Sequence, residues 1–525
     1  MTDPISRASR FPHIRAFALI LFVFLSQWLV LFSAQVPEWD GAYYYAIARS
    51  VAFDQDLHLE NDLMAAYPYV NPPYRASHLD RLEEHRTVTG RITAPFAIGI
   101  SLLWVGWLTV LQPLTPVLLG TSGPVTGYEW PFIVTVAAFS ALCGLMAFWL
   151  GYRLARKVVE EKWAIAAAIT LMFTTPMLYY QFRDAFYSHT AGALTMGLVV
   201  YAWWHIRQRP LTWRAGVLMG GLIGLATLVR WQHLLYLTLP AISALWDWVL
   251  LPGPERRPAF KRLLGYGVAM GAAAFLVFFV QMVVWRLFYG SWIEVPQGDF
   301  YMVWVPLFWR STLFSPYRGL FLWMPVALFS LIGLIDLSRQ SPRTYIPLLL
   351  MLVLEIYINS STRDWFGGGG FGPRRFTSEL VVLVLGYAGF LQLLGQQLSR
   401  WQVIHRLSGW LAAGLGMVLA WQQWILLRYG LLEKMGGRNL SMQPDYRWEE
   451  TTWGEFVRQI VNHVGDLWSR PQDFLIFVHS PAAIWQQAGQ FPWHYLWVLI
   501  GVGVVMVAAA RVIRLIWWHY SQDYP

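Results

Sequence analysis

Long apolar runs, separated by short polar connections, dominate the chain. A helix needs about twenty apolar residues to cross a hydrocarbon core, and most of these runs approach that length. Lipid offers the backbone no hydrogen-bond partners, so spanning segments form helices that satisfy their own polar groups. The pattern predicts an all-α polytopic membrane protein with about twelve transmembrane helices. They are expected near residues 16–34, 130–152, 163–180, 190–206, 215–231, 233–251, 263–289, 319–337, 344–360, 377–396, 408–427 and 493–515.

Lys and Arg residues cluster in alternate connections between these runs. The clusters precede the first run and then lie near 153–162, 207–214, 256–262, 339–343, 400–406 and 511–514. The positive-inside rule places all of them in the cytoplasm, together with both ends of the chain. This N-in, C-in topology leaves a long first external loop, 35–128.

Two apolar segments need separate treatment. If residues 94–112 crossed the membrane, every later basic connection would move outside, so we expect a short interfacial or re-entrant helix within the first external loop. The run 16–34 is longer than a typical signal core and lacks a convincing cleavage site, which predicts an uncleaved first helix.

Three regions follow from this topology. Residues 1–427 are expected to form the main transmembrane module, and 492–525 the last transmembrane helix with a cytoplasmic tail. Residues 428–491 are expected to be a small external helical segment, too short for a large core of its own.

Composition narrows the class of protein. The chain is 56% hydrophobic and 13% charged, which excludes an ordinary soluble globule and a disordered protein. The net charge of +9 would suit nucleic acid, but the basic residues punctuate the apolar runs, so no nucleic-acid partner is expected. Membrane lipids are the expected surroundings, and the many Trp and Tyr residues fit aromatic belts at the two interfaces.

The first external loop has the densest polar chemistry. Asp40 lies a few residues beyond the first apolar run, where desolvation of a carboxylate is costly. An acidic cluster follows, and it lacks the Gly and terminal Glu of an EF-hand loop. A solvated, turn-forming loop is therefore favoured for Asp54 and Asp56 of this cluster, which also contains Glu60, Asn61 and Asp62.

The order of these residues resembles a known superfamily. A first helix is followed by Glu-Trp-Asp-Gly-Ala-Tyr-Tyr-Tyr-Ala-Ile-Ala-Arg-Ser from Glu38, and then by the acidic cluster. This resembles the GT-C membrane glycosyltransferases, and within them the protein-mannosyltransferase and aminoarabinose-transferase branch. That branch carries an acidic residue here, often Asp-Glu. Asp40 matches the Asp, whereas Gly41 stands where the Glu would be, which makes Glu38 the candidate substitute.

Further stretches agree with the resemblance: Arg183 to His189, Thr227 to Gln232 and Trp365 to Phe376. The resemblance implies that Asp40 is the catalytic residue, and that the substrate is bound by Glu38, Tyr44, Asp184, His189, Arg230, Arg374 and Arg375. No cofactor is required by it, although a divalent cation stays open. The candidate ligands for such a metal are Asp40, Asp184 and His189.

External arginines have a physical argument of their own. Positive charge is disfavoured in external connections, and a phosphate needs permanently charged, bidentate donors. Snorkelling towards lipid headgroups is the alternative for any one of them. Arg374 and Arg375 stand out because they follow the glycine-rich stretch Gly367–Gly372, whose backbone can approach a ligand closely.

The resemblance implies an inverting transfer of a sugar from a polyprenyl-phosphate donor to a hydroxyl of a glycan, lipid or protein. The reaction would take place at the outer face of a bacterial inner membrane. The alternatives are a transporter or flippase of lipid-linked sugars and a non-catalytic GT-C relative. Transporters usually hold ionisable residues near the bilayer midplane. The apolar runs here are nearly free of them, with Glu355 as the main exception.

Overall fold

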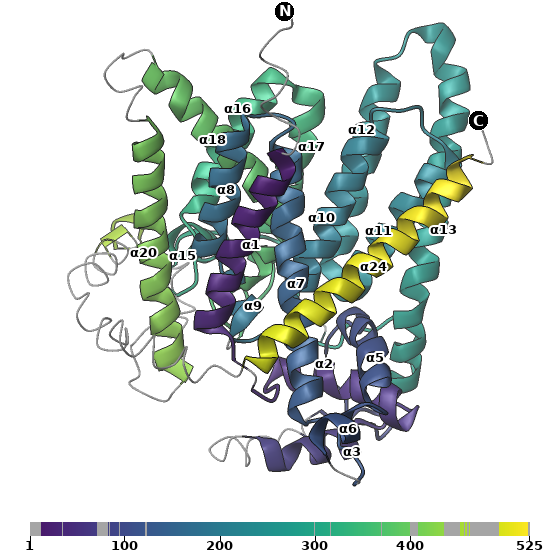
Figure 1. The fold of residues 1–525 in the computed structure, drawn as a ribbon. Helices are drawn as coiled ribbons and strands as arrows, with labels where there is room; N and C mark the ends of the chain where they lie inside the picture. The colour runs from purple at the N-terminus through teal and green to yellow at the C-terminus, as the bar shows by residue number, and fades with distance from the viewer. Residues whose placement is uncertain are drawn as a thin grey trace, which may run out of the picture.

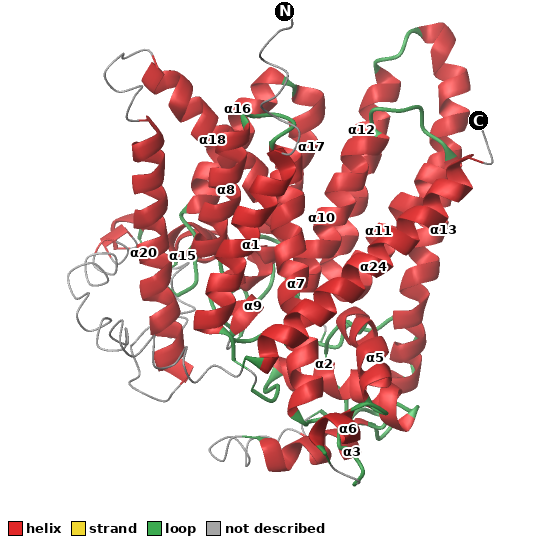
Figure 2. Cartoon of the chain, in the orientation of Figure 1, coloured by secondary structure: helices red, strands yellow, loops and turns green. Residues whose placement is uncertain are grey.

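The computed structural model is helical throughout its described part (Figures 1 and 2). It describes residues 12–33, 35–70, 82, 85–93, 95–120, 123–298, 300–315, 317–368, 370–399, 408–434, 452–455, 457, 458, 461 and 493–522. Within these ranges β-type pairing is confined to two isolated bridges, Arg86 with Ile92 and Met302 with Thr362. The predicted all-α class is confirmed.

The elements in chain order are α1 (Pro12–Leu31), α2 (Asp40–Arg49), η2 (Ser50–Asp54), α3 (Leu59–Ala66), η3 (Tyr67–Tyr69), α5 (Gly99–Leu111), α6 (Thr115–Leu119), α7 (Trp130–Ala155), α8 (Glu161–Thr174), α9 (Met177–Phe182), α10 (His189–Ile206), α11 (Trp213–Val229), η5 (Trp231–Leu237), α12 (Thr238–Val249), α13 (Gly253–Tyr289), α14 (Trp309–Phe314), α15 (Leu320–Trp323), α16 (Val326–Gln340), α17 (Pro342–Ser360), η6 (Arg374–Glu379), α18 (Leu380–Ser399), α20 (Ser408–Lys434) and α24 (His494–Gln522).

Among the described residues, five helices are long and apolar enough to cross a bilayer. They are Ile14–Leu31, Trp130–Ala155, Gly253–Tyr289, Arg374–Leu398 and His494–Val512. The chain is an integral membrane protein, as its apolar pattern predicts. The other expected spans coincide with further helices, several of them short or broken, so the count of about twelve and the N-in, C-in topology stay predictions.

One expected span is divided, and another ends in an extended residue, near the end of the bundle where α2 lies. The run 163–180 divides into α8 and α9 at Thr175, which is extended (φ −123°, ψ 157°). Pro176 follows, and the residue before a proline avoids the helical region. At the end of α11, Arg230 is likewise extended (φ −152°, ψ 121°) before η5 begins. At these two breaks, polar side chains lie outside regular helix.

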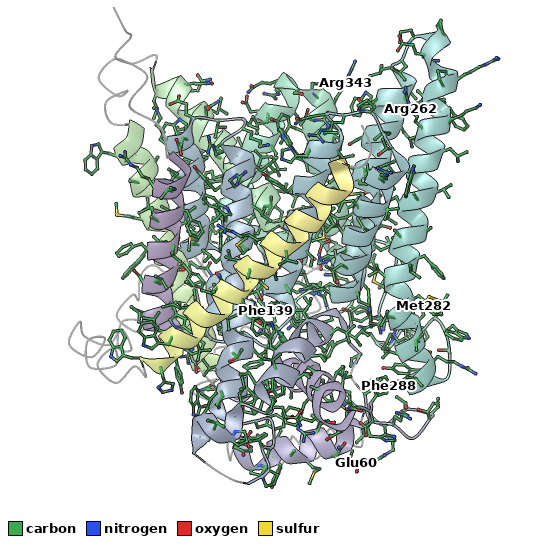
Figure 3. The ribbon with its side chains drawn as sticks, turned by 45° about the vertical axis from the view of Figure 1, so that its right-hand side comes forward. Glu60, Phe139, Arg262, Met282, Phe288 and Arg343 are labelled. Atoms are coloured by element: carbon green, nitrogen blue, oxygen red, sulfur yellow. The ribbon has the colours of Figure 1, made fainter. Side chains whose placement is uncertain are left out.

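The two ends of the bundle differ in character. Figure 3 shows Arg262 and Arg343 at one end, and Glu60 and Phe288 at the other. Helices α2, α3, α5 and α6, all from the loop 35–128, form a layer at the latter end (bottom of Figure 1). Helix α5 has 13 residues, about 20 Å at 1.5 Å per residue, and therefore falls short of a bilayer core. The segment 94–112 thus contributes a short helix to this layer.

The late part of the chain is described only in pieces. Helix α20 continues past the expected end at 427, and α24 covers the expected last span. Most of the external segment 428–491 lies outside the described residues, so that expectation is untested.

Helices α11 and α13 approach each other through a stripe of small residues. A Cβ atom added to Gly216 or Gly220 would collide with the carbonyl oxygens of Tyr266 and Met270, respectively, and one on Gly224 would lie 2.9 Å from the Ala274 oxygen. In membranes, where lipid is as apolar as a side chain, such close backbone contact holds helices together. Gly221, next to this stripe, has open space around it.

We expect Gly220→Leu to destabilise the protein by about 1–3 kcal/mol or more, because the new side chain forces α11 away from α13. Gly221→Leu is the matched control, since it adds the same side chain one position away in open space. Thermal unfolding of both variants in nanodiscs measures the difference. Equal stability of the two would contradict the close helix contact.

Candidate functional site

The candidate site lies where α2 begins, at the end of the bundle that carries the loop 35–128. Asp40 is the first residue of α2, and the preceding Trp39 has a positive φ of 55°. The turn brings Asp40 back towards the bundle instead of letting the chain run on from α1. The rest of α2 is buried, so its position is set by packing.

Asp40 forms an ion pair with an arginine far along the chain. Arg374 Nη1 donates to Asp40 Oδ2 at 3.0 Å, and the two side chains are 14% and 28% exposed. The same guanidinium lies over the ring of Tyr187, 5.3 Å from its centroid. Two of the residues singled out from the sequence are thus in direct contact. The partial exposure leaves the carboxylate accessible to a substrate.

The glycine-rich stretch wraps around Arg374. A Cβ atom on Gly370 would lie 2.5 Å from Arg374 Cδ, and one on Gly367 3.1 Å from Nε. Gly367 and Gly368 also have φ values of 74° and 59°, which glycine adopts without strain. The expectation was that these glycines let the backbone approach a ligand. In the structure, the group that their backbone approaches is the Arg374 side chain itself.

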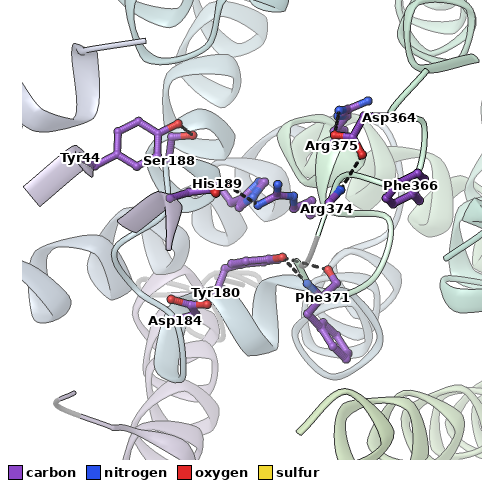
Figure 4. Close-up of polar contacts among 12 residues, drawn as sticks. Tyr44, Tyr180, Asp184, Ser188, His189, Asp364, Phe366, Phe371, Arg374 and Arg375 are labelled. Carbon is purple, nitrogen blue, oxygen red and sulfur yellow. Dashed lines mark hydrogen bonds and ion pairs between the residues drawn. The ribbon is translucent and has the colours of Figure 1, made fainter. Parts of the chain in front are cut away.

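Arg375 has different partners from Arg374. Its Nη2 donates to Asp364 Oδ2 at 2.9 Å and to the Tyr301 hydroxyl at 2.6 Å, while Nη1 donates to Thr362 Oγ1. Asp364 also accepts from the Gly368 backbone N–H at 2.7 Å. Figure 4 shows Arg374 and Arg375 with Asp364 beside them. Arg375 therefore fastens the glycine-rich loop.

His189 is buried, although a lone external histidine is more often a surface residue. Arg230 Nη1 lies 2.5 Å from His189 Nδ1 and Thr377 Oγ1 lies 3.2 Å from the same nitrogen. An arginine can only donate, so Nδ1 accepts and the ring proton sits on Nε2. Arg230 reaches His189 because α11 ends at Val229 and the chain turns there. The arginine and histidine form a second charged unit of the site.

Tyrosines surround these charges. The Tyr44 hydroxyl lies 3.4 Å from Ser188 Oγ. The Tyr180 hydroxyl accepts from the Phe371 N–H at 2.7 Å and donates to the Phe371 carbonyl, which ties α9 to the glycine-rich loop (Figure 4). Burial, with the carboxylates of Asp40 and Asp184 nearby, raises the pKa of Tyr187 well above its usual value. The Tyr187 hydroxyl is therefore neutral.

The remaining candidates lie at the margin. Asp184 Oδ2 accepts from the Tyr179 hydroxyl at 3.4 Å, and Asp184 shares an electrostatic influence on Tyr187 with Asp40. Glu38 is half-buried, two residues before Asp40. A Cβ atom on Gly41 would lie 3.0 Å from Phe186 Cβ. The position where the resemblance places a second carboxylate is thus packed against the connection before α10.

Sequence reasoning did not single out Tyr180, Tyr187, Ser188 or Thr377. Tyr187 and Ser188 lie inside the stretch from Arg183 to His189 that was selected for its charges. Their position next to those residues was the only indication of a role in the sequence. Thr377 contacts His189 across 188 positions of sequence, a distance that no local pattern reveals.

The acidic cluster of the first external loop has a structural role. Arg49 Nη1 contacts Asp62 Oδ1 at 2.5 Å and Asp54 Oδ2 at 2.8 Å, and the Asp62 side chain is fully buried. Burial raises the pKa of Asp62 to about 6, although Arg49 opposes the shift. A solvated turn was favoured from the sequence for Asp54 and Asp56. Asp62, later in the same cluster, is buried because Arg49 of α2 lies over it.

The donor set does not fit a metal ion. Among the residues that the structure describes, no group of three or more His, Cys, Asp or Glu side chains gathers. Asp40 is paired with Arg374, and His189 presents its Nδ1 to Arg230. Two of the three candidate ligands thus already face a cation.

A cavity of about 760 Å³ opens beside the partners of Arg375. Tyr301 and Asp364 line it together with apolar side chains, among them Phe300, Val303 and Leu307. The charged site is therefore adjacent to a mostly apolar chamber.

No protein-family model matches the chain, and no curated protein matches its sequence. Among solved structures it is similar to the archaeal oligosaccharyltransferase AglB from Archaeoglobus fulgidus in complex with an inhibitory peptide and a dolichol-phosphate. The TM-score is 0.45 at 13% identity, over 85% of this chain and 59% of that one. For the apo form of the A. fulgidus oligosaccharyltransferase the TM-score is 0.45 at 12% identity, over 84% of this chain and 57% of that one. For its complex with zinc and sulfate the TM-score is 0.43 at 13% identity, over 83% of this chain and 58% of that one. The chain spans less than two thirds of the length of these proteins.

We expect Arg49→Gln to destabilise the protein by about 3–5 kcal/mol, because it leaves the buried Asp62 carboxylate without its cation. The double variant Arg49→Gln/Asp62→Asn replaces the ion pair with neutral amides and should recover most of that loss. Thermal unfolding in nanodiscs of the two single variants and the double variant measures the coupling. Additive effects of the two substitutions would argue against the pair.

Proposed function

We propose that the chain is a GT-C-type glycosyltransferase that moves a sugar from a polyprenyl-phosphate donor to an acceptor hydroxyl. The observation that carries the proposal is the Arg374–Asp40 ion pair, with Arg230 and His189 as a second charged unit of the same site. A partly exposed carboxylate and two arginines near the end of a membrane bundle suit a reaction in which an alcohol attacks and a phosphate leaves.

Asp40 is assigned to the acceptor. Its carboxylate would orient the acceptor hydroxyl and take its proton as the oxygen bonds to the anomeric carbon. The bond from that carbon to the phosphate oxygen breaks at the same time, and the electron pair leaves with the phosphate. Attack from the opposite face inverts the configuration, which is the outcome that the GT-C resemblance implies.

The arginines are assigned to the phosphate. Negative charge builds on the leaving group, and fixed cations in a poorly solvated site stabilise it more effectively than water does. Arg374 is held by its glycine wrapping and by Asp40, while Arg230 is held by His189. Arg375 would act from η6, next to the cavity of about 760 Å³ that its partners line. That cavity suits the apolar carrier chain.

The finer assignment rests on the resemblance. It favours the protein-mannosyltransferase and aminoarabinose-transferase branch, with a glycan, lipid or protein acceptor. It also places the site on the outer face of a bacterial inner membrane. The location of the site at the end opposite Arg262 and Arg343 supports this orientation, since the basic connections would then be cytoplasmic (Figure 3).

Glu355 bears on the transporter alternative. It is buried in α17, where Asn359 Nδ2 donates to its Oε1 at 3.0 Å, and Arg230 and Arg375 also act on it electrostatically. Glu355, the main ionisable residue of the apolar runs, therefore interacts electrostatically with arginines of the candidate site. This favours a reaction at that end of the bundle over coupled transport. A non-catalytic relative is tested by the first experiment below.

Asp40→Asn is expected to lower sugar transfer by about 10²–10⁴-fold, because the amide cannot accept the proton. A strain that lacks the chain, complemented with wild type or variant, should then accumulate lipid-linked sugar and lose the product glycan by mass spectrometry. Glu60→Gln is the matched control, since Glu60 belongs to an exposed ion pair with Arg86 at 3.5 Å. Full rescue by Asp40→Asn would remove the catalytic role.

Arg374→Gln is expected to slow transfer by about 10²–10³-fold, because a fixed donor to the developing phosphate charge is lost. Arg86→Gln removes the same charge from the exposed pair and should leave transfer unchanged. Product formation in membranes supplied with isolated lipid-linked sugars measures both. Equal activity of the two variants would exclude Arg374 from the reaction.

A further inference from the structure

A second charged cavity lies at the opposite end of the bundle from the candidate site. It has a volume of about 250 Å³ and is formed by the ends of α10, α12 and α13. Three arginines line it, Arg207, Arg209 and Arg262, against one carboxylate, Asp247. The lining therefore has a positive excess. Nothing in the proposed reaction uses these residues.

The cavity is more than a cluster of exposed cytoplasmic charges. Arg207 lies over the ring of Trp203, 5.1 Å from its centroid, and its Nη1 donates to Thr344 Oγ1 at 2.6 Å. Its Nε is buried and has no hydrogen-bond partner among the residues that the structure describes. The positive-inside rule requires basic residues near this interface but does not require a half-buried one held by an aromatic floor.

The surroundings of the cavity are amphipathic. Trp203 donates to Ser243 Oγ at 3.0 Å inside it, so the floor is ordered. Outward from the same helices, apolar side chains of α12 and α13 are exposed, including Leu245, Val249 and Leu264. A ligand with an anionic head in the cavity would therefore have its tails against an apolar helix surface.

Size and charge select the ligand. Pockets that enclose drug-sized molecules start at about 300 Å³, so this cavity suits a headgroup and not a whole lipid. Guanidinium groups bind phosphate oxygens in a bidentate manner. Basic pockets between transmembrane helices on the cytoplasmic side are typical binding sites for anionic lipid headgroups. We propose that this cavity binds the phosphate of an anionic phospholipid from the leaflet at the basic end of the bundle.

The proposal does not depend on the glycosyltransferase function. Bound lipid would join the end of α10 to the α12–α13 hairpin. It would thus hold α13, whose other face packs on the glycine stripe of α11. The expected consequence is greater thermal stability of the whole chain in bilayers that contain anionic lipid.

The test uses the full chain in phosphatidylcholine nanodiscs with increasing phosphatidylglycerol. Native mass spectrometry counts the retained lipid, and tryptophan fluorescence follows thermal unfolding. Arg209→Gln/Arg262→Gln should weaken phosphatidylglycerol binding about tenfold or more, at about 1 kcal/mol per basic residue. Both residues are exposed, so folding in pure phosphatidylcholine should be unchanged.

The matched control is Arg257→Gln/Lys261→Gln, which removes two exposed charges of α13 that do not line the cavity. It should keep the affinity of the wild type. An equal loss in both double variants would overturn the proposal, because general surface charge would then explain the binding. Stabilisation by inorganic phosphate in pure phosphatidylcholine, with none from phosphatidylglycerol, would overturn the lipid assignment.

Discussion

The Arg374–Asp40 ion pair is the contact on which the organisation of the candidate site depends. It joins α2, the first helix after α1, to the start of η6, just before α18, across 334 positions of sequence. The pair is partly exposed, so it is expected to contribute little net stability. The arrangement is therefore better explained by positioning than by stability. The glycine-rich loop and Tyr187 both contact this arginine, and the hydrogen bonds from α9 hold the loop in place.

Interruptions of the helices supply the polar groups of the site. A regular transmembrane helix uses all of its backbone hydrogen bonds internally and presents only side chains. Where Pro176 breaks α8 from α9, and where α11 stops before Arg230, the chain turns within the bundle. These turns place Tyr180 and Arg230 near His189. Small residues elsewhere, such as the stripe on α11, let the remaining helices pack closely enough to hold the turns in place.

Only part of the site could be predicted from local sequence. Asp40 was selected because a carboxylate is costly at the end of an apolar run. Arg230 and Arg374 were selected as external phosphate donors, and His189 from the family resemblance. The structure brings these four residues together in two charged units. Arg375 was selected by the same argument, yet Asp364 and Tyr301 engage it. Asp62 was assigned no role of its own from the sequence, and it is buried under Arg49. In each case the partner lies on another element, which the spacing of residues does not reveal.

The sequence by itself determined the class of the protein, an all-α integral membrane protein, and the approximate place of most of its helices. It could do so because apolar length and backbone satisfaction are local requirements in lipid. Tertiary structure alone decided which charges meet, why Gly41 faces Phe186 and what the glycine-rich loop encloses. These outcomes depend on contacts between different elements, some close in sequence and others, such as Asp40 with Arg374, separated by 334 positions. Such contacts are set by packing geometry, which composition and periodicity do not encode.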